Sequence, residues 1–129
     1  MIRLGTNPIA WSNDDMPELG GATPLETCLA EARRAGYAGI ELGNKFPREA
    51  GALRPILAGH GLALVSGWWS ARLLERSVEA ELSAIAAHAD LLKEMGCKVV
   101  IVAETSHGVA GARAAFPARR RRRGSSRRR

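Results

Sequence analysis

The stretch that decides the fold is Gly39-Ile40-Glu41-Leu42-Gly43-Asn44-Lys45-Phe46-Pro47, a short apolar run that breaks at glycines and then presents polar side chains. If Ile40 and Leu42 face one side of a buried parallel strand, Glu41 faces the other side, which in a barrel lies near the axis. A buried carboxylate needs a partner, and Lys45 at the carboxyl end of the strand is a candidate. The alternative interpretation is an ion pair at a strand end with no chemical role.

Predicted strands and helices alternate along the chain. Short apolar runs predict strands at 2–6, 38–42, 62–66 and 98–102, and amphipathic patterns predict helices at 24–36, 48–60 and 77–95. Strict alternation of this kind indicates right-handed parallel units, and eight such units form a (β/α)8 barrel. We therefore predict the α/β class and assign residues 1–112 to a partial TIM barrel with about four parallel strands and three helices.

Local patterns add detail to these elements. Thr23-Pro24-Leu25-Glu26 matches a capping box at the start of the first helix. Pro55 interrupts the second helical pattern, so that helix is expected to begin as late as Leu53. The β-branched fourth strand is expected to be buried on both faces. The inner stripe of the third helix is expected to contain Val78, Leu82, Ile85, Ala89 and Leu92.

Polar and aromatic side chains follow each predicted strand. Because the carboxyl ends of parallel strands meet on one face of a barrel, these loops are expected to converge there. The paired tryptophans after the third strand either roof a pocket or fill a corner of the core, and their composition favours neither. The residues concerned are Asn7 and Trp11, Glu41 to Lys45, Trp68 and Trp69, and Glu104 to His107.

Composition indicates a single domain with an unusual end. The net charge of +6 is unevenly spread, because residues 1–112 hold ten basic and thirteen acidic side chains while residues 113–129 hold nine arginines and no acid. Cys28 and Cys97 are too isolated to form a zinc or disulfide pattern and are expected to be reduced thiols. The sequence shows no membrane span or secretion signal, so we expect a cytoplasmic protein.

Three motifs resemble those of the inosose dehydratase family, which belongs to the xylose-isomerase-like barrels. The resemblance covers residues 2 to about 108, a stretch that would supply only the first half of a family barrel. It implies a hydro-lyase of inositol catabolism that removes water from 2-keto-myo-inositol, with a divalent cation such as manganese or cobalt and with glutathione as a further reported cofactor. The motifs are 5–15, 39–47 and 66–70.

The resemblance also implies roles for individual residues. Lys45 and Glu41 are the expected catalytic residues, with Lys45 stabilising enolate charge or acting as a base, and Glu41 orienting Lys45 or binding a substrate hydroxyl. The remaining positions are expected to bind the cyclitol substrate, and a tryptophan is expected to lie against the C–H face of the ring. These positions are Asn7, Trp11, Trp68 and Glu104.

No metal ligand is assigned within this chain. His60 and His88 fall on predicted helices away from the strand ends, where each is expected to be structural or solvated. His107 lies on the correct face, but with Glu104 it makes at most half of a metal site. The resemblance implies that most metal ligands come from later strands that this sequence lacks.

The arginine-rich tail, residues 113–129, allows two interpretations. It is either a disordered arm that binds nucleic acid or, as we favour, a segment read out of frame with no evolved function. A half-barrel of four strands is expected to aggregate, to dimerise or to be loosely packed, and to lack dehydratase activity by itself. The alternative functions are a sugar isomerase or epimerase of the same superfamily and a small binding protein with a basic arm.

Overall fold

The computed structural model describes residues 2–106. The expectations for His107 and for the arginine-rich tail lie outside the described residues. Between residues 2 and 106, strands and helices alternate as the sequence predicts, with a short 3-10 helix, η1 (Pro8–Ala10), after the first strand.

The sheet of this described part is all parallel. Its strands are β1 (Gly5–Thr6), β2 (Gly39–Leu42), β3 (Ala63–Ala71) and β4 (Ile101–Glu104), and they lie side by side in chain order. Consecutive parallel strands joined through helices are the repeating unit of a (β/α)8 barrel. The prediction of a partial TIM barrel with four strands and three helices is confirmed for residues 2–106.

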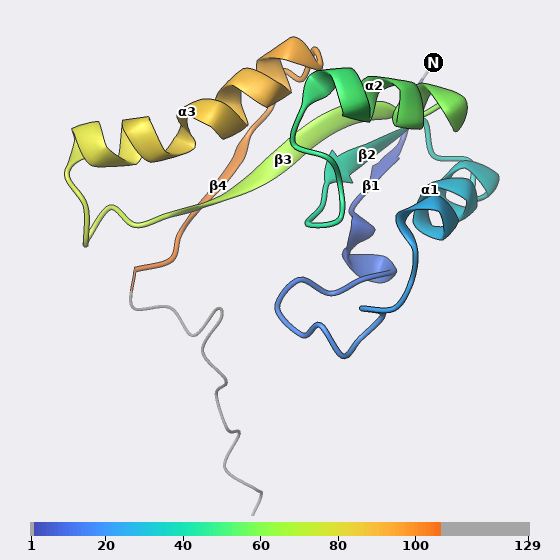
Figure 1. Ribbon diagram of the computed structural model, residues 1–129, viewed down its shortest axis with the longest axis horizontal. Coiled ribbons are helices and arrows are strands. Elements are labelled where there is room, and N and C mark those ends of the chain that lie inside the picture. The colour runs from blue at the N-terminus through green and yellow to red at the C-terminus, as the bar shows by residue number, and fades with distance from the viewer. Residues whose placement is uncertain (1, 107–129) are drawn as a thin grey trace, which may run out of the picture.

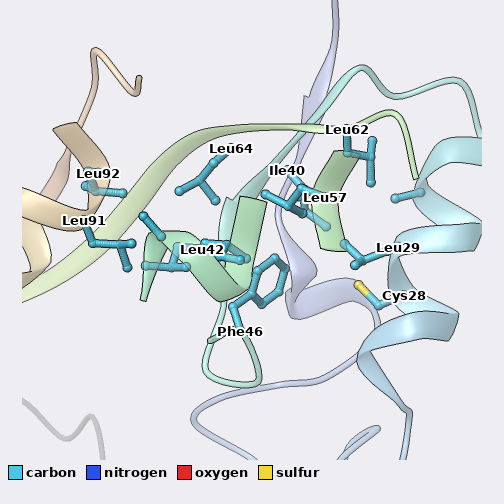
Figure 2. Close-up of a cluster of buried hydrophobic side chains, with 13 residues drawn as sticks. Cys28, Leu29, Ile40, Leu42, Phe46, Leu57, Leu62, Leu64, Leu91 and Leu92 are labelled. Atoms are coloured by element: carbon cyan, nitrogen blue, oxygen red, sulfur yellow. The ribbon is translucent and has the colours of Figure 1, made fainter. Parts of the chain in front are cut away.

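The helices α1 (Leu25–Arg34), α2 (Ala50–Gly59) and α3 (Val78–Glu94) cover one side of the sheet (Figure 1). The core lies between these helices and the strands, where Leu29, Ile40 and Leu53 are fully buried. Figure 2 shows how side chains from helix and strand interdigitate in this layer. The other side of the sheet corresponds to the interior of a barrel.

The first helix begins next to Pro24 as predicted, but its predicted cap and the late start predicted for the second helix are wrong. The residue that caps α1 is Pro24 rather than Thr23, without a side-chain bond, so the expected capping box does not form. The Thr23 carbonyl instead accepts a hydrogen bond from the Lys45 ammonium. Helix α2 begins at Ala50 and continues through Pro55. Both Pro55 and Gly51, four residues earlier, are exposed, so water can replace the one backbone bond that the proline removes.

The predicted inner stripe of α3 is also wrong at three of its five positions, because Val78, Leu82 and Ala89 are exposed. Val78 and Leu82 are each 64% exposed, whereas Glu81, Leu91 and Leu92 are buried against the sheet. Glu81 faces inward because it accepts hydrogen bonds from β3 and from the loop that follows it. The exposed stripe faces a region that no described helix covers.

Strands β3 and β4 end later than predicted. Strand β3 continues through both tryptophans to Ala71, and β4 covers Ile101–Glu104 rather than residues 98–102. The pairing of Trp68 with Ile101 and of Ala71 with Glu104 sets this shift. The prediction that the fourth strand is buried on both faces is wrong for the described part, because no described strand pairs with its outer edge and Val102 is 52% exposed.

Candidate functional site

A hydrogen-bonded chain of three side chains joins the residue after β1, the carboxyl end of β2 and the middle of β3. Asn7 Nδ2 donates to Glu41 Oε1 over 2.6 Å, and Ser66 Oγ donates to Glu41 Oε2 over 2.9 Å. Asn7 is held in turn by its Oδ1, which accepts the backbone N–H of Ile9 at the start of η1. Glu41 is only 7% exposed, so its charge depends on these two donors. We call Asn7, Glu41 and Ser66 the carboxylate network.

The register of β2 and β3 brings Ser66 into the carboxylate network. Ile40 pairs with Leu64, but the register then shifts by one residue and Glu41 pairs with Ser66. This irregularity places Val65 and Ser66 on the same face as Glu41. Gly39 makes the packing possible, because a Cβ there would lie 2.3 Å from Cγ1 of Val65. Ser66 is not among the site residues predicted from the sequence, where its only signal is a polar residue at the end of a predicted apolar strand.

Lys45 has a different environment from the one expected. Its ammonium donates to the backbone carbonyls of Gly20, Gly21 and Thr23, in the loop before α1. An ammonium has three N–H groups, and these three carbonyls use all of them. Among the described residues, the partners of Glu41 are therefore Asn7 and Ser66, and the expected pairing of Glu41 with Lys45 does not occur.

Trp11 is held against helix α1. Its Nε1 donates to Glu31 of α1 over 2.8 Å, and its ring packs partly buried against the core. Trp11 and Lys45 contribute to a small, mostly apolar recess together with Cys28 and Phe46. Burial raises the pKa of the Cys28 thiol above its ordinary value, which keeps the thiol protonated and unreactive.

The two tryptophans of β3 take opposite faces of the sheet, which resolves their two interpretations. Trp68 lies on the interior face, is 51% exposed and donates to Ser70 Oγ over 3.1 Å. Trp69 points toward α3, where its Nε1 donates to Glu81 over 2.7 Å and its ring lies 5.5 Å from that of His88. The Trp69 hydrogen bond holds the pKa of the Glu81 carboxyl below its ordinary value. Only Trp68 shares the face of the carboxylate network.

Glu104 joins β4 to the loop after β3. Its Oε2 accepts the backbone N–H of Leu73 over 2.7 Å, and its Oε1 accepts that of Ser106 over 2.6 Å. These contacts hold the two loops together at the carboxyl end of the sheet. The structure therefore brings Asn7 and Glu41 together, sets Trp68 on the same face, and gives Glu104 and Lys45 backbone partners.

Within residues 2–106, no three His, Cys, Asp or Glu side chains gather closely enough to hold a metal ion. His60 lies beside Glu26, with Nε2 and Oε1 3.1 Å apart, and His88 packs under β3. The described part of the chain does not by itself fit a divalent cation. It also contains no helix long and apolar enough to cross a membrane.

This chain is similar in sequence to several known proteins. No family model matches the chain. The rhizopine catabolism protein MocC of Rhizobium meliloti is 56% identical over 107 residues, which cover 83% of this chain and 33% of that protein. The inosose dehydratase of Geobacillus thermodenitrificans is 44% identical over 110 residues, and inosose dehydratase 2 of Bacillus cereus has the same identity and length of match.

The chain is a homologue of the inosose dehydratases. The matches to these two dehydratases cover 85% of this chain but 37% of each enzyme, so the chain spans little more than a third of their length. The resemblance expected from the three sequence motifs is thereby confirmed. A match over 110 of the 129 residues includes Glu41 and Ser66 of the carboxylate network.

Proposed function

We propose that residues 2–106 form part of the substrate site of an inosose dehydratase, a hydro-lyase that removes water from 2-keto-myo-inositol. The observation that carries this proposal is the buried carboxylate network, whose Asn7 and Glu41 lie at the carboxyl ends of β1 and β2 while Ser66 lies within β3. Functional groups of (β/α)8 enzymes gather at this end of the barrel. The homology to inosose dehydratases supplies the reaction and the substrate.

The reaction requires that a proton leave the carbon beside the ketone and that the hydroxyl on the next carbon depart as water. In this proposal Glu41 is the group that faces the substrate, as a base or as an acceptor for a substrate hydroxyl. Each carboxylate oxygen accepts one bond within the network, and a carboxylate oxygen can accept about two. Glu41 therefore keeps acceptor capacity for a polyol while Asn7 and Ser66 fix its orientation.

Lys45 remains a candidate for stabilising the enolate charge. For that role its ammonium would have to exchange at least one of the carbonyls of Gly20, Gly21 and Thr23 for the substrate. Lys45 also fixes the loop before α1 in its present position.

The remaining positions form the proposed wall of the substrate site. Trp68 offers an exposed indole on the face of Glu41, suited to the C–H face of a cyclitol ring. Asn7 can share its amide between Glu41 and a hydroxyl. Trp11 and Glu104 hold the surrounding loops through Glu31 and Leu73, and their proposed contact with substrate requires movement of these loops.

The proposal includes a divalent cation, manganese or cobalt, and glutathione as cofactors of the complete enzyme. Because residues 2–106 contain no cluster of three ligands, the cation would need ligands from other strands of a complete barrel. A cytoplasmic location belongs to the same proposal, and the free thiols of Cys28 and Cys97 suit a reducing compartment. The relative named for rhizopine catabolism suggests a related cyclitol as an alternative substrate.

A chimaera tests this proposal. Residues 2–106 would replace the matching segment of the Geobacillus thermodenitrificans inosose dehydratase, and dehydration of 2-keto-myo-inositol would be followed with manganese or cobalt present. We expect turnover, and we expect Glu41→Gln in the chimaera to lower kcat by at least about 100-fold, the usual scale for a lost acid or base. Ser70→Ala, on the same face, is the matched control and should leave kcat within twofold, a margin of about 0.4 kcal/mol.

Either of two results would overturn the proposal. One is a chimaera that is monodisperse and has the circular dichroism of the parent but does not dehydrate the substrate. The other is full activity in the Glu41→Gln variant. Isomerisation of a keto sugar without water loss would favour the alternative function in the same superfamily. The isolated 129-residue chain is expected to show no turnover.

A further inference from the structure

The loop before α1 places three backbone carbonyls around a single cation. The carbonyl oxygens of Gly20 and Gly21 lie 3.4 and 2.8 Å from Nζ of Lys45, and the Thr23 carbonyl accepts a third hydrogen bond from the same atom. We call these three carbonyls the carbonyl cage. They match the three N–H groups of an ammonium one to one. Converging backbone carbonyls of this kind bind cations in proteins.

The shape of the carbonyl cage is set by the packing of the loop on itself. A Cβ on Gly20 would lie 2.0 Å from the carbonyl oxygen of Trp11, and a Cβ on Gly21 would lie 2.0 Å from that of Pro17. Gly20 also has a φ of 75°, in the left-handed region that glycine adopts without strain. Glycine at these two positions therefore allows the loop to fold back closely enough to gather the carbonyls.

Backbone hydrogen bonds hold the same loop. The Asn13 N–H donates to the Leu19 carbonyl over 3.0 Å, and the Thr23 N–H donates to the Gly20 carbonyl over 2.9 Å. A carbonyl oxygen has two lone pairs, so Gly20 can accept this bond and the bond from Lys45 together. Neither backbone bond involves Lys45. The three carbonyls would therefore still face one point if the ammonium left.

The Lys45 ammonium has no further N–H group to offer while it fills the carbonyl cage. Contact with a substrate would therefore leave at least one of the three carbonyls without its donor. Lys45 and Thr23 are half-buried, and an acceptor that loses its donor away from water costs free energy. A cation from solution that entered as Lys45 left would remove this cost.

We propose that the carbonyl cage is a binding site for a small primary ammonium ion, including ammonium itself, and that Lys45 is its tethered occupant. Such an ion presents N–H groups to the carbonyls as Lys45 does. The Asp14 side chain lines the same recess as Thr23 and Lys45 and adds a carboxylate to the surroundings. The site itself is independent of the proposed dehydratase function, whereas the exchange of Lys45 for a solution cation during turnover rests on it.

Proteolysis of the 129-residue chain with Lys45→Ala tests the site. Chymotrypsin cleaves after leucine, and Leu19, next to Gly20, is 54% exposed. Cleavage between these two residues is followed by mass spectrometry at neutral pH, in methylammonium chloride and in tetramethylammonium chloride of equal ionic strength. Only methylammonium has N–H groups. We expect it to slow cleavage at least about threefold, the effect of a ligand at about twice its dissociation constant.

Lys45→Met is the matched control. It removes the same charge, but its Cε takes the place of the lysine Cε, which the methyl group of methylammonium would need. We expect this variant to be cleaved at the same rate in the two salts. The unmodified chain, whose carbonyl cage is filled by Lys45, should also be cleaved equally in both.

Equal cleavage of the Lys45→Ala variant in the two salts would overturn the site, and so would equal protection of the Lys45→Ala and Lys45→Met variants. If Lys45→Ala lacks the circular dichroism of the unmodified chain, the same comparison in the chimaera that carries this substitution decides.

Turnover by the chimaera with Lys45 intact tests the exchange. Ammonium chloride should raise kcat/KM at least about twofold over tetramethylammonium chloride, because it stabilises the state in which Lys45 has left the carbonyl cage. An active chimaera that responds equally to both salts would overturn the exchange. A chimaera without turnover in either salt would count against the proposed function, and the proteolysis result would still decide the site.

Discussion

Replacing Ser66 by alanine removes one of the two donors to the buried Glu41 carboxylate. The Ser66 hydroxyl lies 2.9 Å from Glu41 Oε2, and Glu41 is almost fully buried, so no solvent molecule can readily take the place of the donor. Hydrogen bonds to charged groups contribute about 1.5–3 kcal/mol. We therefore expect Ser66→Ala to lower the free energy of unfolding by about 2 kcal/mol.

Urea unfolding, followed by far-ultraviolet circular dichroism at one fixed protein concentration, measures this loss. With a slope of about 2 kcal/mol per molar urea, a loss of about 2 kcal/mol moves the midpoint down by about 1 M. Ser70→Ala is the matched control, because Ser70 lies on the same strand and is exposed, with Trp68 Nε1 as its partner. Its expected cost is below about 0.5 kcal/mol.

The comparison between the two serines decides the outcome. If Ser66→Ala costs no more than Ser70→Ala, Glu41 does not depend on Ser66, and the carboxylate network is not the organising feature of the site. A double variant with Asn7→Ala adds a further check. Because both donors serve one carboxylate, the two effects should differ from additivity by more than about 0.5 kcal/mol.

Two further predictions concern the loop before α1 and the histidine under β3. Lys45→Met leaves the carbonyls of Gly20, Gly21 and Thr23 without their cation, so chymotrypsin should cleave this loop about tenfold faster. A tenfold change in rate corresponds to about 1.4 kcal/mol of local stability. Arg54→Met, which removes a side-chain bond elsewhere, should leave the cleavage rate unchanged. His88 has a pKa below its ordinary value, mainly because of burial and secondarily because of Arg48. Since the unfolded chain binds this proton more readily, the free energy of unfolding should fall as the pH drops below about 6.5. In urea unfolding at pH 7.5 and 5.5, His88→Gln should reduce this pH dependence. A variant with the same pH dependence as the unmodified chain would contradict the prediction.

The order of elements could be predicted from the sequence because each strand and helix has its own local pattern. Gly39 to Leu42 reads as a buried strand, and the stripe of Cys28, Leu29 and Ala32 reads as the inner side of a helix, and both are buried as expected. Alternation then implies parallel pairing with little ambiguity. None of these inferences needs a contact between distant residues.

The errors arise where a distant contact overrides the local pattern. The apolar residues 98–102 read as a strand, but pairing with Trp68 to Ala71 places β4 three residues later. The apolar spacing of α3 predicts that Val78 faces inward, but Trp69 needs a partner for its N–H and draws Glu81 to the sheet instead. A buried hydrogen bond of this kind outweighs the orientation of one exposed valine.

The candidate site shows the same division. Glu41 was identifiable because a charged residue inside an apolar strand is unusual, but its donors were not. Ser66 reaches Glu41 only through the register shift between β2 and β3, and no spacing of residues in the sequence predicts that shift. Lys45, four residues from Glu41, was the obvious partner by proximity in sequence and instead binds carbonyls more than twenty residues away.

The contacts within residues 2–106 show which features of the site are complete in four strands and which are not. The members of the carboxylate network lie in β2, in β3 and directly after β1, so its orientation is set without any further strand. The apolar interior is different, because Val65 and Trp68 remain exposed until strands stand opposite them. A site that is electrostatically organised but open to water lacks the low dielectric that strengthens charge stabilisation of an enolate. If the proposed function is correct, catalysis therefore requires a closed barrel as well as the cation ligands that residues 2–106 do not supply.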